Sequence, residues 1–220
     1  MESIYLDNLF ERMKSLLSEL GASLPSVSII AEEDNDPYRI LAATLISLRT
    51  RDDVTLSASR RLFSKAGSLK DIEKLSENEI AELIKPAGFY KRKARDLKTI
   101  AQIINNDYSG VIPDDLEALM ALPGVGIKTA SLVLNLGFGK DAVCVDCHVH
   151  EIANRLGWVA TKTPEETELE LRKIMPQRFW IPLNELLVMY GQNVCLPISP
   201  KCSICTERDY CPRRGVSKWR

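Results

Sequence analysis

The sequence has no long apolar run. No segment stays apolar for the roughly 18 residues that a membrane-spanning helix needs. The N-terminal MESIYLDNLFERMKSLL also lacks the basic start and apolar run of a secretory signal. These absences argue against a membrane protein and a secreted protein, so we expect an intracellular chain with no membrane contact. In a reducing compartment, clustered cysteines are more often metal ligands than disulfides, which bears on the six cysteines present.

An excess of positive charge is absent too. The 220 residues carry a net charge of -1 and a pI near 6.2, which excludes a globally basic nucleic-acid binder. Any binding to an acidic polymer must therefore rest on local clusters. In KPAGFYKRKARDLK a single acid, Asp96, accompanies six basic residues: Lys85, Lys91, Arg92, Lys93, Arg95 and Lys98. A solvated helix face has the same pattern, so charge alone leaves both interpretations open.

Strand-like alternation of apolar and polar residues is confined to two short segments, 26–30 and 142–146. Helix signals are frequent instead. Asp36-Pro37 is typical of a helix start, and 163–166 (TPEE) matches a capping box with proline at the first helical position. Residues at helical spacing after Asp36-Pro37 predict one buried stripe: Ile40, Leu41, Thr44, Leu45 and Leu48. The pattern predicts an all-α chain, and 45% hydrophobic residues suffice for one large or two small cores.

Four cysteines near the C-terminus form a compact set. They are spaced C-x6-C-x2-C-x5-C in a polar segment that we expect at the surface: Cys195, Cys202, Cys205 and Cys211. Four thiolates so close in sequence can surround a metal at little loop-closure cost, and both zinc and an iron-sulfur cluster accept them. The spacing predicts a metal site and leaves the metal open. Cys144 and Cys147 form a further C-x2-C, which we interpret as buried small hydrophobic residues.

The segment LEALMALPGVGIKTASLVLNLGF predicts a helix, a tight turn and a second helix. Gly124, Val125 and Gly126 form the turn, where glycine permits left-handed torsions and the close approach of another backbone. The second helix then presents N–H groups without intrahelical partners, and these suit a phosphate of a nucleic-acid strand. A plain αα-hairpin with glycine in its turn is the alternative.

Lys128 stands in the first turn of that second helix, where the positive end of the helix dipole disfavours an ammonium ion. At helical spacing it shares a face with Ser131 and Asn135, away from the apolar face. A lysine there is poorly placed for stability but well placed to act as a neutral amine nucleophile. A phosphate contact is the alternative role.

Asp146 lies 18 residues after Lys128 and precedes another helical pattern. Its simplest role is that of an N-cap, and an ionised carboxylate there could also stabilise positive charge on a sugar. The two histidines, His148 and His150, follow at once. Each is a candidate general base or phosphate contact, with a purely structural role as the alternative.

In their order and spacing, these motifs resemble the endonuclease III family of helix-hairpin-helix DNA glycosylases. The resemblance rests on LPGVGIKTA, on VDCHVH with its Asp146, and on the four-cysteine loop, and it covers nearly the whole chain. It implies two all-α lobes with a DNA-binding cleft between them. One is a six-helix barrel with the hairpin, at 27–140; the other is an iron-sulfur domain made from 1–26 and 141–220. The resemblance also implies a 4Fe-4S cluster on the four cysteines.

The same resemblance implies an activity. Lys128 matches the family's catalytic lysine and Asp146 its catalytic aspartate, in an enzyme that removes an oxidised pyrimidine from double-stranded DNA and cuts at the abasic site. The nucleotide is flipped out of the stack, the lysine amine attacks C1′, and the resulting Schiff base allows β-elimination of the 3′ phosphate. We expect the turn and Lys91, Lys93 and His148 to contact the DNA. The enzyme is expected to act as a monomer, in the cytoplasm with the nucleoid if its source is prokaryotic.

Three positions depart from the family pattern or need comment. Arg49 stands where family members often carry a glutamine that fills the gap left by the flipped base, and arginine favours guanine edges. Phe89 occupies the position of an apolar wedge that enters the stack, and Cys147 replaces a usual threonine. Two other functions stay open: a monofunctional mismatch glycosylase, whose members usually lack this lysine, and a non-enzymatic iron-sulfur DNA-binding module.

Overall fold

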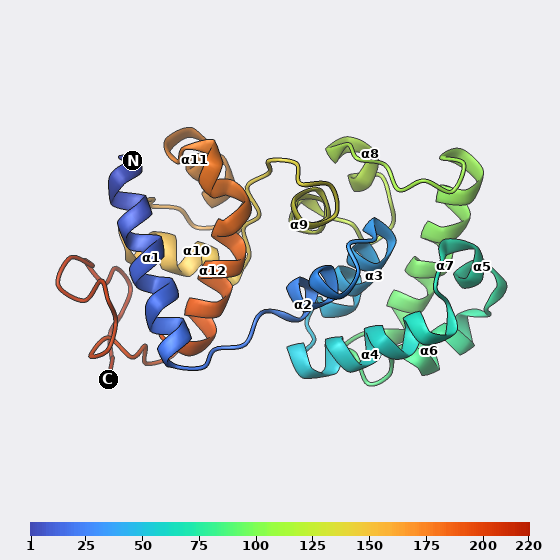
Figure 1. Cartoon of the computed structure of the whole chain (residues 1–220), viewed down its shortest axis with the longest axis horizontal. Helices are drawn as coiled ribbons and strands as arrows, with labels where there is room; N and C mark the ends of the chain where they lie inside the picture. The colour runs from blue at the N-terminus through green and yellow to red at the C-terminus, as the bar shows by residue number, and fades with distance from the viewer. The chain divides into compact units, whose positions relative to one another are not determined.

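The computed structural model describes residues 1–220 and contains helices and loops but no β-strand (Figure 1). The predicted all-α class is confirmed. The chain forms two compact units, of which unit 1 is Met1–Leu24 with Asp141–Arg220, and unit 2 is Pro25–Lys140. No helix combines the length and the apolar character needed to cross a bilayer.

Unit 2 holds eight helices. They are α2 (Ser26–Glu33), α3 (Pro37–Ser47), α4 (Asp52–Lys65), α5 (Leu69–Lys74), α6 (Glu77–Ile84), α7 (Tyr90–Asp107), α8 (Leu116–Met120) and α9 (Ile127–Phe138). Segment 26–30, a possible strand by its alternation, lies within α2. Val27 and Ile30 are about one helical turn apart and both are buried, so this segment packs through one face of a helix.

Helix α3 lies at the centre of unit 2 and packs against α2, α4, α7 and α9. Asp36 caps it by accepting a hydrogen bond from the Tyr38 N–H at 2.9 Å, with Pro37 at the first helical position, as predicted. The single buried stripe that we expected is too narrow. Every residue from Ile40 to Ile46 is buried, because neighbouring helices surround α3 on all sides.

Unit 1 combines both ends of the chain. Its helices are α1 (Ser3–Glu19), α10 (Cys147–Arg155), α11 (Pro164–Ile174) and α12 (Trp180–Asn193), with a 3-10 turn, η1 (Gln177–Phe179). Helix α12 packs against α1 and α10. Thr163 caps α11 by accepting from the Glu166 N–H, but the Glu166 carboxylate accepts from the N–H of Lys162 rather than of Thr163, so the predicted box is incomplete.

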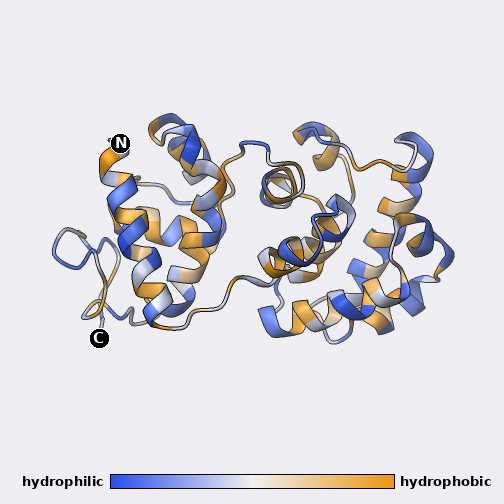
Figure 2. Ribbon diagram, in the orientation of Figure 1, coloured by the Kyte–Doolittle hydropathy of each residue, from blue (hydrophilic) through white to orange (hydrophobic).

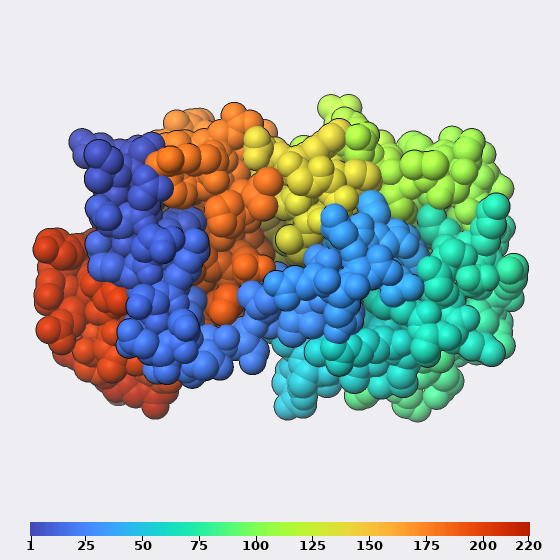
Figure 3. All heavy atoms as spheres, viewed as in Figure 1, coloured from blue at the N-terminus to red at the C-terminus, as the bar shows by residue number.

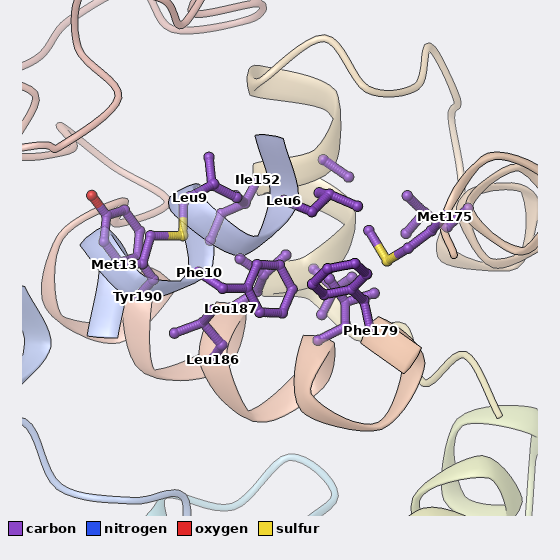
Figure 4. Close-up of a cluster of buried hydrophobic side chains, with 14 of the residues drawn as sticks. Leu6, Leu9, Phe10, Met13, Ile152, Met175, Phe179, Leu186, Leu187 and Tyr190 are labelled. Atoms are coloured by element: carbon purple, nitrogen blue, oxygen red, sulfur yellow. The ribbon is translucent and has the colours of Figure 1, made fainter. Parts of the chain in front are cut away.

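The core of unit 1 is built from the facing sides of its helices (Figure 4). Phe10 of α1 and Phe179 of η1 meet edge to face, with ring centroids 5.1 Å apart. Tyr190 of α12 is also buried in this cluster, and Figure 4 shows its hydroxyl oxygen at the edge of the group. Helices across the chain alternate hydrophobic and hydrophilic residues along their ribbons, as helices with one buried face must (Figure 2).

Candidate functional site

The predicted helix-turn-helix is present in unit 2. Helix α8 ends at Met120, α9 begins at Ile127, and the two helices pack against each other. Asp115 caps α8 by accepting from the Ala118 N–H at 2.9 Å. Val125, predicted to contact DNA, is buried, and its N–H donates to the Leu122 carbonyl at 3.2 Å. It therefore anchors the turn, and the N–H groups that lack partners within α9 begin after it.

The two glycines of this turn differ in conformation. Gly124 has φ +76°, which favours glycine, and a Cβ there would lie 3.0 Å from Asp96 Oδ2, a tight contact that requires this side chain to shift. Gly126 has φ -98°, and an added Cβ would meet no protein atom within 4 Å. The left-handed torsion that the sequence predicted for this turn is thus found at Gly124, while Gly126 keeps the start of α9 open to an approaching ligand.

These two positions yield opposite predictions for alanine. We expect Gly124→Ala to lower the free energy of unfolding by about 1–2 kcal/mol, the cost of a left-handed non-glycine residue. Gly126→Ala should leave stability unchanged or raise it by about 0.4–1 kcal/mol, yet weaken duplex DNA binding about tenfold because its methyl group occupies the approach path. Chemical denaturation and fluorescence anisotropy measure the two quantities. Unchanged DNA affinity in Gly126→Ala would contradict the phosphate-binding role of the turn.

Lys128 is the second residue of α9 and is partly exposed, as the sequence predicted for a first-turn residue. No acidic residue occupies that first turn. The face of α9 that carries Lys128 is more buried than we expected. Ser131 and Asn135 are 1% and 4% exposed, so α9 is buried on this face as well as on its apolar face. Lys128 is therefore a partly exposed residue on a mostly buried helix, and the neighbouring packed residues limit the positions that its amine can occupy.

Arg49 and Phe89 lie on neighbouring loops of unit 2. Both have left-handed backbones, with φ 53° and 56°, a conformation that costs a non-glycine residue about 1–3 kcal/mol. Phe89 is 63% exposed, and the Arg49 guanidinium carbon lies 5.6 Å from its ring centroid. A cavity of about 400 Å³ adjoins the pair and reaches the hairpin turn, with this lining: Leu45, Leu48, Arg49, Phe89, Arg92, Lys93, Asp96 and Gly124.

Lys93 is not the DNA contact that the sequence predicted. It is 6% exposed, and its Nζ donates to the carbonyl oxygens of Ile46 (2.7 Å) and Leu48 (2.6 Å) and to Thr50 Oγ1 (3.0 Å). Burial lowers the pKa of Lys93 to about 8. Lys91, two residues earlier on α7, is exposed and stays a predicted DNA contact. A helical step of two residues turns one side chain outward and the other inward.

Asp146 of unit 1 is the N-cap of α10, as predicted. Its Oδ1 accepts a hydrogen bond from the Val149 N–H at 3.0 Å, and the residue is 9% exposed. Segment 142–146, which leads into the cap, is neither helix nor strand. Cys144 is buried as predicted, but Cys147 is exposed, because the first helical residue after the cap faces solvent rather than the core.

The histidines after Asp146 are both partly buried. A Cβ on Gly191 would lie 2.3 Å from His148 Nδ1, so the His148 ring rests directly on the backbone of α12. The DNA contact predicted for His148 stays a prediction. His150 Nδ1 lies 2.6 Å from Thr167 Oγ1, within a small polar network in unit 1, which favours the structural role for this histidine.

The four-cysteine loop follows α12 and is held by buried side chains of unit 1. The Arg155 guanidinium is 8% exposed and donates to the carbonyls of Cys195, Leu196 and Pro197 and to Cys195 Sγ at 3.3 Å. The Tyr190 hydroxyl donates to Cys205 Sγ at 3.3 Å and accepts from the Thr206 N–H at 3.2 Å.

A second anchor joins this loop to α1, which lies beside the C-terminal segment (Figure 3). Glu207 is fully buried, and its Oε1 accepts from Arg12 Nε at 2.9 Å and Nη2 at 2.7 Å. The sequence interpretation placed Glu207 at the surface, because the loop is polar (Figure 2). Arg155, Tyr190 and Glu207 were not recognised as functional residues. Their partners lie 15 to 195 residues away in the chain, a separation that no local pattern reveals.

Burial and neighbouring thiols disfavour the charged thiolate form of three cysteines in the loop. Burial raises the pKa of Cys195 to about 11, and burial followed by the neighbouring Cys205 raises the pKa of Cys202. Burial also raises the pKa of Cys211. Thiolates held this close disfavour one another, and a bound metal centre would relieve that cost. No group of three or more histidine, cysteine, aspartate or glutamate side chains converges as a site for one metal ion.

Comparisons with known proteins agree with this geometry. Residues 42–177 match the family model described as HhH-GPD superfamily base excision DNA repair protein. Endonuclease III of Thermotoga maritima is 44% identical over 191 residues, which cover 86% of this chain and 90% of that protein.

Solved structures resemble the whole chain. One, a trapped endonuclease III–DNA covalent intermediate, has a TM-score of 0.83 at 27% identity and covers 97% of both chains. A thermostable thymine-DNA glycosylase has a TM-score of 0.74 at 26% identity and covers 92% of this chain. By family model, sequence identity and fold, the chain belongs to the endonuclease III family of the HhH-GPD superfamily of base excision DNA repair proteins.

Proposed function

We propose that this chain, a base excision repair DNA glycosylase and lyase, removes oxidised pyrimidines from duplex DNA through a Schiff base on Lys128. The observation that carries the proposal is the position of Lys128, the second residue of α9 directly after the open Gly126 turn. An amine there stands next to N–H groups that hold a DNA phosphate. Likeness to a trapped endonuclease III–DNA covalent intermediate supports a covalent route.

The reaction assigned to Lys128 has two stages, release of the base and cleavage of the strand. The amine lone pair forms a bond to C1′ of the flipped nucleotide while the glycosidic bond breaks, and the departing base takes a proton. Opening of the sugar leaves a protonated Schiff base. Loss of a C2′ proton then expels the 3′ phosphate, so the strand is cut on that side. Asp146 is assigned to stabilise positive charge on the sugar and to accept protons, for which an N-capping carboxylate is suitably ionised.

The DNA contacts are assigned within unit 2. Gly124 and Gly126 shape the turn that receives the backbone, and exposed Lys91 adds a phosphate contact. Phe89, exposed on its left-handed loop, is assigned as the wedge, and Arg49 beside it meets the base left unpaired. We assign unit 2 as the barrel with the hairpin and unit 1 as the iron-sulfur domain. The enzyme is proposed to work as a monomer.

Cys195, Cys202, Cys205 and Cys211 are proposed to hold a 4Fe-4S cluster. The four cysteines lie within 17 residues, as such a cluster allows, and membership of the endonuclease III family supports a cluster over one zinc ion. The cluster, when bound, cross-links the loop and supplies structure, not a reactant. Arg155 and Tyr190 orient the loop through Cys195 and Cys205.

The cluster has a direct test. Protein purified without oxygen should be brown and contain about four iron and four sulfide per chain. Cys205→Ser should lose the iron, whereas Cys147→Ser, a change at the exposed cysteine outside the loop, should retain it. Elemental analysis and visible absorbance are the measurements. A colourless protein with one zinc ion and full activity would show that the assignment is wrong.

Activity is tested on a duplex with one thymine glycol, by measuring base release, strand cleavage and a covalent adduct after borohydride reduction. All three are expected. Base release without cleavage or adduct would instead support a monofunctional mismatch glycosylase; the chain also resembles a thymine-DNA glycosylase structure. Binding without base release would support an iron-sulfur binding module. An undamaged duplex is the control and should give none of the three products.

A further inference from the structure

The two side chains assigned to enter the DNA stand on loops that are strained in the same way. Arg49 follows α3 and Phe89 precedes α7, and each is a non-glycine residue with a left-handed backbone. Their side chains are in contact, with the guanidinium of Arg49 over the Phe89 ring. Strained exposed loops keep such a geometry only when buried interactions enforce it. The structure must therefore contain groups that hold both loops.

The buried ammonium of Lys93 holds the first loop. Its three acceptors, Ile46 O, Leu48 O and Thr50 Oγ1, all belong to the end of α3 and the residues around Arg49. Carbonyl oxygens at the end of a helix have no intrahelical partners and carry negative charge, so an ammonium satisfies them well. Lys93 lies on the first turn of α7, four residues after Phe89, and its own position is therefore tied to the second loop.

Thr50 joins the two loops directly. Its Oγ1, which accepts from Lys93, also accepts from the Gly88 N–H at 3.0 Å. Gly88 precedes Phe89, and a Cβ on Gly88 would lie 2.4 Å from the Arg49 carbonyl oxygen. The absence of a side chain at Gly88 is what lets the loops approach this closely. One hydrogen-bonded group thus connects the loops of Arg49 and Phe89. It consists of the buried Lys93 and the partly buried Thr50 and Gly88.

We infer that Lys93 is a positioning residue that holds Arg49 and Phe89 as a preassembled pair for insertion into the duplex. This inference rests on the proposed function, which assigns those two side chains to the DNA. A buried ammonium is costly unless fully hydrogen-bonded, and here each proton has an acceptor. Ordering the pair in the free protein removes the cost of ordering it when DNA binds.

Lys98 is a matched control in the same helix. Its Nζ also donates to two backbone carbonyls, those of Glu73 and Leu75 at the end of α5. Like Lys93 it binds carbonyl oxygens at a helix end, although it is only partly buried and has two acceptors, and the loop it holds carries neither Arg49 nor Phe89. A purely structural effect should therefore appear equally in Lys93→Met and Lys98→Met. An effect through the inserted pair should appear only in Lys93→Met.

The test uses a duplex that contains an uncleavable abasic analogue, with the fluorescent base 2-aminopurine opposite it. The fluorescence of 2-aminopurine increases when the base is unstacked, and this increase is the signal. Lys93→Met should weaken the binding that produces this signal by roughly 10- to 100-fold, the scale of misplaced positioning groups. Lys98→Met should leave the signal unchanged. Phe89→Ala should weaken it too, and the double variant Lys93→Met with Phe89→Ala should be no weaker than Phe89→Ala alone, because Lys93 acts through Phe89.

Thr50 supplies a second pair of variants, one that keeps the hydroxyl and one that keeps the volume of the side chain. Thr50→Ser retains the hydroxyl and should keep the signal, whereas Thr50→Val should weaken the binding that produces it, as Lys93→Met does. Equal effects of Lys93→Met and Lys98→Met, or additive effects of Lys93→Met and Phe89→Ala, would overturn the inference. The assay involves no chemistry. A wild type that unstacks 2-aminopurine in this duplex but releases no base from the thymine glycol duplex would therefore refute the proposed reaction and leave this inference standing.

Discussion

Lys128→Gln is expected to abolish the borohydride-trapped adduct and to slow strand cleavage by on the order of 10⁴-fold or more, the scale seen when a nucleophile is lost. Glutamine keeps an unbranched polar side chain, shorter by one atom, but has no basic amine. The surrounding α9 is buried on both faces, so a variant of similar volume should leave its packing intact. Affinity for a duplex with an uncleavable abasic analogue should therefore remain close to that of the wild type.

A control for this experiment lies just beyond the other end of the same helix. Lys140 pairs with the Asp114 carboxylate at 2.7 Å and has no assigned role in the reaction. Lys140→Gln should form the adduct at the wild-type rate. Gel analysis of single-turnover reactions measures both variants. If Lys128→Gln still cleaved at the wild-type rate, Lys128 would be a phosphate contact and the nucleophile would be another group.

Asp146→Asn separates two roles of one side chain. Asparagine also caps helices well, and its Oδ1 can still accept from the Val149 N–H, so stability should change by only a few tenths of a kcal/mol. The negative charge is lost, however, and with it the stabilisation of positive charge on the sugar. We expect base release to slow by about 10²-fold or more. Single-turnover base release and chemical denaturation are the two measurements.

Two further variants complete that design. Asp146→Ala removes the cap as well as the charge and should lose about 1 kcal/mol of stability in addition. Asp36→Asn makes the same change at the cap of α3, where Asp36 accepts from the Tyr38 N–H, and should leave base release unaltered. Wild-type turnover in Asp146→Asn would mean that Asp146 serves only as a cap.

Local features of the fold follow from neighbouring residues in the chain, and these the sequence predicted well. The caps at Asp36 and Asp146 form because a carboxylate and an N–H two or three residues later meet with little chain in between. The hairpin turn with Gly124 and the first-turn position of Lys128 have the same origin. Each depends on torsions and contacts within a few residues, so the pattern of residue types suffices.

The errors share a different cause. Lys93 belonged to an apparently uniform basic cluster, yet its ammonium is buried beneath the end of α3, more than 40 residues earlier in the chain. Glu207 belonged to an apparently polar loop, yet it is buried against Arg12 of α1. In both cases a charged side chain leaves water because a distant partner satisfies it. Charge patterns describe side chains, but they do not locate their partners.

Residue types and spacing alone were enough to indicate the helical class, the hairpin with its lysine, the capping aspartate and the four-cysteine loop. These depend on short-range geometry, and the motif order points to one family. Tertiary structure alone decided which side chains face outward and which hold others in place. Lys93 fastens the Arg49 and Phe89 loops, and Tyr190 reaches Cys205, only because helices far apart in sequence pack together and remove these polar groups from water.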